Sequence, residues 1–120
     1  MWDPLTGNMQ VAFVFLNFNG EGYAVNPFGG DNKVYTAKAK ALATTMATAW
    51  VNFVNHLDPN GKKGLSLPGG STWPKYDTGA GGGVGQNVIW DLAGGAIEID
   101  DWRAAGIKWL MEHALSVFGN

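Results

Sequence analysis

The two histidines, His56 and His113, are the chain's only imidazoles, and acid–base hydrolysis by a serine would depend on them. A serine nucleophile needs a histidine base within hydrogen-bond reach and a carboxylate that orients this base. The three serines are Ser66, Ser71 and Ser116, and none stands in the G-x-S-x-G pattern that exposes a nucleophile. The histidines form no H-x-x-x-H pair, so neither a triad nor a zinc site is predicted.

Three carboxylates, Glu98, Asp100 and Asp101, form an acidic group that could in principle act in acid–base chemistry. Aspartate just before an apolar helical segment more commonly caps the helix, because it accepts bonds from free N–H groups and complements the dipole. We therefore expect Asp100 or Asp101 to be a cap. An alternative in which His113 works with Glu112 or Asp101 as a small enzyme lacks a nucleophile.

The glycine-rich run GAGGGVG, residues 79–85, resembles a phosphate-binding loop in composition only. The G-x-G-x-x-G register fails because Val84 and Gln86 stand where the last glycine is needed. No Gly-Lys pair is followed by Ser or Thr, as a P-loop requires. The absence of cysteine removes thiolate ligands. We expect a surface loop here, and no cofactor and no metal.

Composition indicates a folded, weakly charged chain. The 120 residues carry a formal net charge of −2 with six Trp and six Phe, too aromatic for a disordered chain and without a basic face for nucleic acid. No segment approaches the roughly 20 apolar residues that span a bilayer. The start, Met1-Trp2-Asp3-Pro4, lacks the basic and apolar regions of a signal peptide, and the compartment stays open.

The elements that would position these residues begin with Gln10–Phe18, an apolar and β-prone run. It predicts a buried strand or a buried one-turn segment, and its length does not decide between them. Loop chemistry follows at Asn26-Pro27 and Gly29-Gly30. A helix is predicted from Val34 to Leu57, ending before Asp58-Pro59 because a residue before proline avoids the helical region. Its apolar stripe has helical spacing and comprises Leu42, Met46, Ala49, Trp50, Phe53, Val54 and Leu57.

The second half of the chain predicts a loop, a hairpin and a helix. Residues 60–86 are rich in glycine, and Trp73-Pro74 within them predicts a rigid plug at a core edge, with a ligand platform as the alternative. Asn87–Leu92 and Ala96–Ile99 predict a hairpin around Gly94-Gly95. A last helix is predicted from Trp102 to about Val117. We expect structural roles for both histidines, His56 in the earlier helix and His113 in this one. One face of this helix is predicted to pack inward: Trp102, Gly106, Trp109, Leu110, His113 and Val117.

Several motifs recur together in one family. They are Val11–Phe15, Asn26-Pro27-Phe28, Trp50 and Phe53 ahead of Asp58-Pro59-Asn60, Trp73-Pro74-Lys75-Tyr76, and Asp101-Trp102-Arg103 with Ala105-Gly106. Their order and spacing resemble the C-terminal end of type B carboxylesterases, a family that includes fungal lipases and cholinesterase-like enzymes. The resemblance runs from about Gln10 to Trp109, and no single motif in it is unique.

The resemblance implies an α/β fold class. The chain would be the C-terminal part of an α/β-hydrolase, a single partial domain over residues 1–120. It would contain one or two sheet strands, a long helix, a loop-rich segment, a short hairpin and a C-terminal helix. The family's serine elbow, oxyanion-hole glycines and acid lie upstream of this region. Its catalytic histidine would fall at Gly7, three places before Gln10, which itself stands where the family has Glu.

The resemblance therefore implies no catalytic residue in this chain and no ester hydrolysis by the chain alone. The ester substrate would belong only to the full-length parent, and the partner would be the remainder of the hydrolase domain. Members of the family are often secreted. Without this partner the apolar faces would favour self-association. An alternative is a small non-catalytic binding module that uses Trp73 and Tyr76 as a contact surface.

Overall fold

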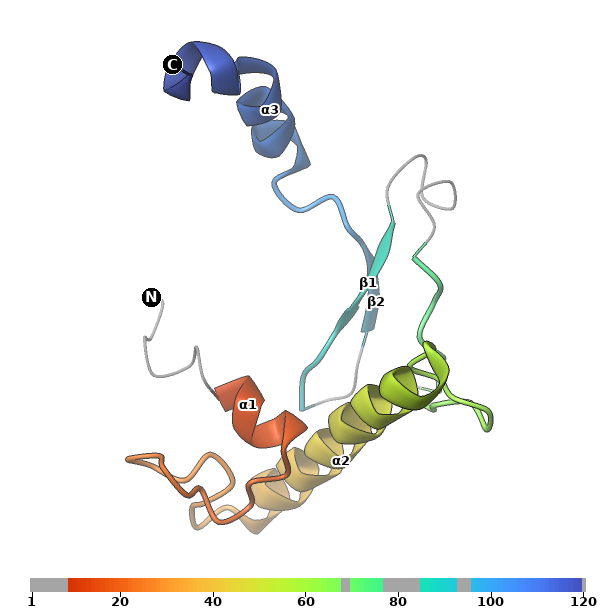
Figure 1. The fold of residues 1–120 in the computed structure, drawn as a ribbon. Helices are drawn as coiled ribbons and strands as arrows, with labels where there is room; N and C mark the ends of the chain where they lie inside the picture. Colours follow the sequence, from red (N-terminus) through yellow and green to blue (C-terminus); the bar gives the residue numbers. More distant parts are fainter. Residues whose placement is uncertain (1–8, 68–69, 77–84, 93–95, 120) are drawn as a thin grey trace. The chain divides into compact units, whose positions relative to one another are not determined.

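The computed structural model describes residues 9–67, 70–76, 85–92 and 96–119 (Figure 1). Helices α1 (Met9–Val14), α2 (Lys33–His56) and α3 (Ala104–Phe118) combine with strands β1 (Gln86–Ile89) and β2 (Ala96–Ile99). The strands form a two-stranded antiparallel sheet, so the described part of the chain is of mixed α/β composition. The chain divides into two compact units, one of Met1–Trp73 with Val88–Ile97 and one of Pro74–Asn87 with Glu98–Asn120.

The first apolar run forms a helix, so of the two alternatives predicted for Gln10–Phe18, a buried strand or a buried one-turn segment, the strand is wrong. Helix α1 spans Met9–Val14 and ends with Leu16 at φ 53°, where Asn17 N–H donates to the Ala12 carbonyl at 2.9 Å. This is a Schellman cap. A lone strand would leave its backbone N–H and C=O groups unpaired, whereas a helix pairs them within itself. The helix packs on α2 and buries Ala12 and Phe13, while Phe15 is exposed.

Helix α2 confirms the predicted Val34–Leu57 helix to within one residue at each end. Asn32 caps its start: the side-chain Oδ1 accepts from Val34 N–H at 3.1 Å and from Tyr35 N–H at 3.0 Å. Leu57 ends it at φ 56°, and its N–H donates to the Phe53 carbonyl at 2.7 Å. His56 is the last helical residue.

A core forms where α1 and the following loop cover the N-terminal half of α2, as Figure 1 shows. Phe28, 2% exposed, lies at its centre, with its ring centroid 4.6 Å from Phe13 and 5.1 Å from Phe18. Asn26 holds this loop, because its Oδ1 accepts from Phe28 N–H at 2.8 Å and its Nδ2 donates to the Phe18 carbonyl at 3.2 Å. Gly20 lies against Asn26 at φ +67°, so a Cβ there would approach it to 2.7 Å.

A second apolar cluster covers α2 near Ala49. It contains the buried side chains of Leu65 and Leu67, with Trp73, Val88 and Trp90 packed against them. The Trp73 and Trp90 rings meet edge to face at 5.6 Å. This agrees with the plug predicted for Trp73-Pro74. The predicted hairpin is confirmed at β1 and β2, while its predicted turn at Gly94-Gly95 lies outside the described residues.

Helix α3 is largely exposed, so the prediction that its Trp and Leu side chains pack inward is wrong for this chain. The helix begins at Ala104, not at the predicted Trp102, which lies just before it and is 71% exposed. Within α3, Trp109 is 52% exposed and Leu110 46%. The predicted aspartate cap is also wrong: Arg103 takes the cap position at φ 58° with no side-chain hydrogen bond. Asp101 contributes only its carbonyl, which accepts from Ala104 N–H at 2.9 Å. None of the described helices is long and apolar enough to cross a membrane.

Candidate functional site

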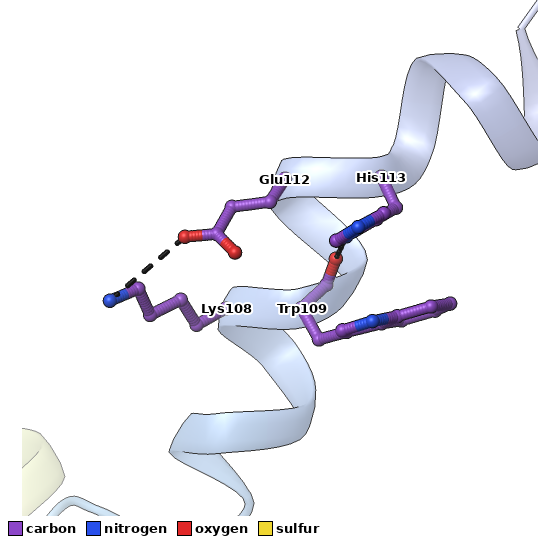
Figure 2. A network of polar contacts seen from close by, with 4 residues as sticks. All are labelled: Lys108, Trp109, Glu112 and His113. Atoms are coloured by element: carbon purple, nitrogen blue, oxygen red, sulfur yellow. Dashed lines mark hydrogen bonds and ion pairs between the residues drawn. The ribbon is translucent and has the colours of Figure 1, made fainter.

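The side chains of α3 that could do acid–base chemistry are engaged in local contacts (Figure 2). His113 Nδ1 donates to the Trp109 carbonyl at 2.8 Å, and the two rings stack with centroids 4.6 Å apart. Glu112 pairs with Lys108 at 3.9 Å instead of with His113. Ser116 Oγ donates to the main-chain carbonyl of His113 at 2.8 Å. The alternative of a small enzyme built on His113 and Glu112 therefore finds no support in this geometry.

No described histidine side chain is hydrogen-bonded to a serine hydroxyl or to a carboxylate. His56, Ser66 and Ser71 are exposed, and within the described part of the chain no hydrogen bond joins their side chains. Within the described ranges, no group of three or more His, Asp or Glu side chains could hold a metal ion. Gly7 and the glycine run from Gly79 to Val84 lie outside the described residues.

An open groove of about 540 Å³ runs along one side of α3. Its apolar lining comes from Trp102, Ile107 and Met111, and Asp100, Lys108 and Glu112 supply its charges. Lys108 and Glu112 are 78% and 56% exposed and pair with each other. The groove thus has an apolar surface with solvated charges and presents no buried polar group to a ligand.

Tyr76 and Asp100 form the one long-range pair of polar side chains among the described residues of the second unit. The Tyr76 hydroxyl donates to Asp100 Oδ2 at 3.0 Å, and Asp100 N–H donates to the Gly85 carbonyl at 2.8 Å. The bond to Asp100, and then the negative charge of this carboxylate, raise the pKa of Tyr76 above its ordinary value of 10.0. The Tyr76 ring lies over Gly85, where a Cβ would come within 2.3 Å of it. Asp100 thus holds Tyr76, and the acid–base role considered for Asp100 has no histidine partner.

Asn60 forms the densest polar contact of the first unit. Its Oδ1 accepts from Trp73 N–H at 2.8 Å, and its Nδ2 donates to the Trp73 carbonyl at 2.9 Å. We call this two-way bond the Asn60 clamp. The clamp fixes the backbone of the half-buried Trp73, whose ring packs on Trp90. Trp73 is thereby less available as the contact surface of the binding-module alternative, whereas Tyr76 is 57% exposed.

Sequence reasoning missed both polar contacts. The run Asp58-Pro59-Asn60-Gly61 predicts a helix stop, whereas the partner of the Asn60 side chain, Trp73, lies 13 residues further on. The signal that could have predicted this contact is the amide side chain of Asn60 in a turn that contains a proline, with the apolar Trp73 a short loop further on. The sequence marks Tyr76 as part of the Trp-Pro-Lys-Tyr motif and, with Trp73, as a candidate contact surface, but not as a partner of Asp100. In comparisons with known proteins, no family model matches the chain, and no curated protein or solved structure gives a significant match.

Proposed function

We propose that the chain forms the C-terminal flank of a type B carboxylesterase-like α/β-hydrolase. In this role it is a scaffold segment that packs against the rest of a hydrolase domain and contributes no member of the catalytic triad. The ester would be bound and cleaved by residues outside this chain. Two observations support the proposal. One is the order and spacing of the sequence motifs. The other is an apolar stripe on α2 that is buried in its first part and exposed to solvent in its second part.

The observation that carries the proposal is the apolar stripe of α2. Its first part is covered: Leu42 is 8% exposed and Ala49 3%. Its second part has the same helical spacing but is open to solvent, with Trp50 57% exposed, Phe53 48% and Val54 73%. A helix face that is apolar along its whole length normally packs along its whole length. The open half therefore fits a surface that further residues would cover.

Helix α3 supports the same interpretation. Its large apolar side chains surround most of the helix, and those exposed are Ile107, Trp109, Leu110, Met111, Leu115 and Phe118. A helix that is apolar on most sides is typical of a buried element. The only charged side chains within α3 are Lys108 and Glu112, which lie one turn apart on one side.

The chemistry of the described side chains is compatible with a scaffold role. A serine hydrolase needs a nucleophile, a base and oxyanion donors held together. His56 and His113 contact no serine hydroxyl within the part of the chain that the structure describes. We therefore expect the purified chain to show no ester hydrolysis above that of a His56→Ala, His113→Ala double variant.

Complementation tests the proposal. The chain is co-expressed with the N-terminal part of a fungal type B carboxylesterase that ends just after its catalytic histidine. We expect the two pieces to copurify and to hydrolyse a short acyl ester that neither piece cleaves alone. A Phe53→Asp variant should abolish this activity, because it places a charge on the open half of the α2 stripe. Thr44→Asp, on the exposed side of the same helix, is the matched control.

Two results would contradict the proposal. One is turnover by the chain alone that disappears in His56→Ala. The other is a failure of the N-terminal piece to bind the chain or to gain activity from it, in wild type and control alike.

A further inference from the structure

The chain contains two Asn-Gly pairs, Asn19-Gly20 and Asn60-Gly61. Asparagine is chemically labile in proteins, and a following glycine leaves its side chain open to attack because it has no Cβ. In this reaction the glycine nitrogen attacks the asparagine Cγ, a C–N bond forms and ammonia leaves. Water then opens the cyclic imide to aspartate or isoaspartate and is the only co-reactant.

The two pairs share the same backbone protection. Gly20 N–H donates to the Asn17 carbonyl at 3.0 Å, and Gly61 N–H donates to the Asp58 carbonyl at 3.0 Å. Both glycines have a positive φ, 67° and 62°. The backbone alone therefore predicts similar reactivity for the two sites.

The asparagine side chains differ. Asn19 is exposed, and its amide makes no hydrogen bond to any residue that the structure describes. The Asn60 amide makes three: two form the Asn60 clamp, and the third runs from Nδ2 to Asp58 Oδ1 at 3.0 Å. Its Cγ can reach the Gly61 nitrogen only after these bonds break. Gly61 is itself held, since a Cβ there would lie 2.7 Å from the Asn52 amide.

We infer that Asn60-Gly61 is a deamidation site masked by the fold, and that its conversion releases Trp73 from the turn after α2. An aspartate carboxylate at position 60 has no donor for the Trp73 carbonyl or for Asp58 Oδ1. It would instead place oxygen against oxygen at both contacts. Asn19 is the unmasked site of the same chemistry, and its conversion breaks no side-chain bond among the described residues.

Peptide mapping by mass spectrometry tests the first part of the inference, the masking of Asn60. The intact chain is incubated in mildly alkaline buffer with and without urea. In the native state Asn19 should convert at least about tenfold faster than Asn60, which corresponds to about 1.4 kcal/mol of local opening. In urea the two rates should converge. Asp58→Ala should speed the reaction at Asn60 and leave Asn19 unchanged. Equal native rates, or a faster Asn60, would overturn the assignment.

Amide hydrogen exchange at Trp73 tests the second part of the inference, the release of Trp73 when Asn60 is converted. Asn60→Asp should raise the exchange rate of the Trp73 N–H by about tenfold or more, because its acceptor geometry is lost. Asn19→Asp makes the same change of charge and should leave this rate unchanged. If both variants leave Trp73 equally protected, conversion does not release it. If Asn60→Asp does not fold, the rise is instead followed in wild-type protein as Asn60 converts.

Discussion

At the scale of single residues, the polar contacts among the residues that the structure describes hold loops rather than assemble reactive groups. Asn26, Asn32 and Asn60 each bond backbone N–H groups of nearby segments, as short amide side chains commonly do. The hydrogen bond between Tyr76 and Asp100 joins two side chains that lie 24 positions apart in the sequence. These contacts explain why asparagine and tyrosine occur at these loop positions, because burial of apolar side chains alone would not select those residue types.

The Tyr76–Asp100 bond predicts an alkaline loss of stability. The folded-state pKa of Tyr76 is raised above 10.0, first by its bond to Asp100 and then by the charge of this carboxylate. A raised pKa means that the neutral hydroxyl is favoured in the folded state. The contribution of the Tyr76–Asp100 bond to the stability of the fold is therefore complete below pH 10.0. It is lost as the pH rises through the folded-state pKa of Tyr76.

Absorbance titration of tyrosinate and unfolding measured on both sides of this pH range check the prediction. Tyr76→Phe should remove the tyrosine whose pKa is raised and flatten the alkaline loss of stability. Tyr35→Phe, which removes a hydroxyl without a hydrogen bond to the described residues, is the control. If Tyr76→Phe lowers the amplitude of the tyrosinate titration but leaves its shape and the alkaline loss of stability unchanged, the result counts against the bond.

At the scale of elements, periodicity predicted α2, the hairpin and the existence of a C-terminal helix, because these depend on local spacing and turn residues. It did not decide α1, since a short apolar run fits a strand or a helix equally well until its neighbours are known. It also could not place Phe28 in the core, because an asparagine loop, not a helix or strand, carries this side chain.

The start of α2 depends on Asn32. Its Oδ1 accepts two of the free N–H groups of the first turn, so Asn32→Ala should lower the free energy of unfolding by about 1 kcal/mol. Urea denaturation followed by circular dichroism measures this loss. Asn55→Ala, an equal change at an exposed position inside the same helix, should cause no loss, and a comparable effect there would refute the capping role.

The end of α2 is strained at Leu57. A leucine at φ 56° has its Cβ too close to the neighbouring carbonyl, which costs about 1–2 kcal/mol, whereas glycine adopts this conformation freely. Leu57 is 81% exposed, so removing its side chain loses little burial. We expect Leu57→Gly to raise the free energy of unfolding by about 0.5–1 kcal/mol, after the extra unfolded-state entropy of glycine.

The same denaturation experiment provides the control for Leu57. Val54→Gly, one turn earlier and inside the helix, should destabilise the chain by about 1 kcal/mol. Opposite signs for the two glycine substitutions would confirm that the backbone conformation, and not the loss of a side chain, sets the effect. Destabilisation by both would show that Leu57 packs against something in solution.

At the scale of the whole chain, the extent of exposed apolar surface could only be seen in the structure. Helical spacing identifies which side chains share a face, but not whether another segment covers them. Trp50 and Leu42 belong to one stripe, yet only Leu42 is buried. Cover depends on contacts distant in sequence, which is why the predicted inward packing of Trp109 failed.

The exposed stripe of α2 predicts self-association of the isolated chain. Trp50 and Phe53 each leave about half of their side chain exposed. Covering both would remove roughly 200 Å² from water, worth about 5 kcal/mol at 25 cal/mol/Å². This gain is comparable to the lower estimates of the cost of association, about 4 kcal/mol, so the stripe by itself supports only weak pairing.

Sedimentation over a range of concentrations should therefore show reversible association. A Trp50→Lys, Phe53→Lys double variant should shift it toward monomer, because two charges would have to be buried in the contact. Thr44→Lys with Thr48→Lys adds the same charges on the exposed side of α2 and should leave association unchanged. A wild-type chain that stays monomeric at every concentration would contradict the predicted self-association and would weaken the support that the open half of the stripe gives to a hydrolase partner.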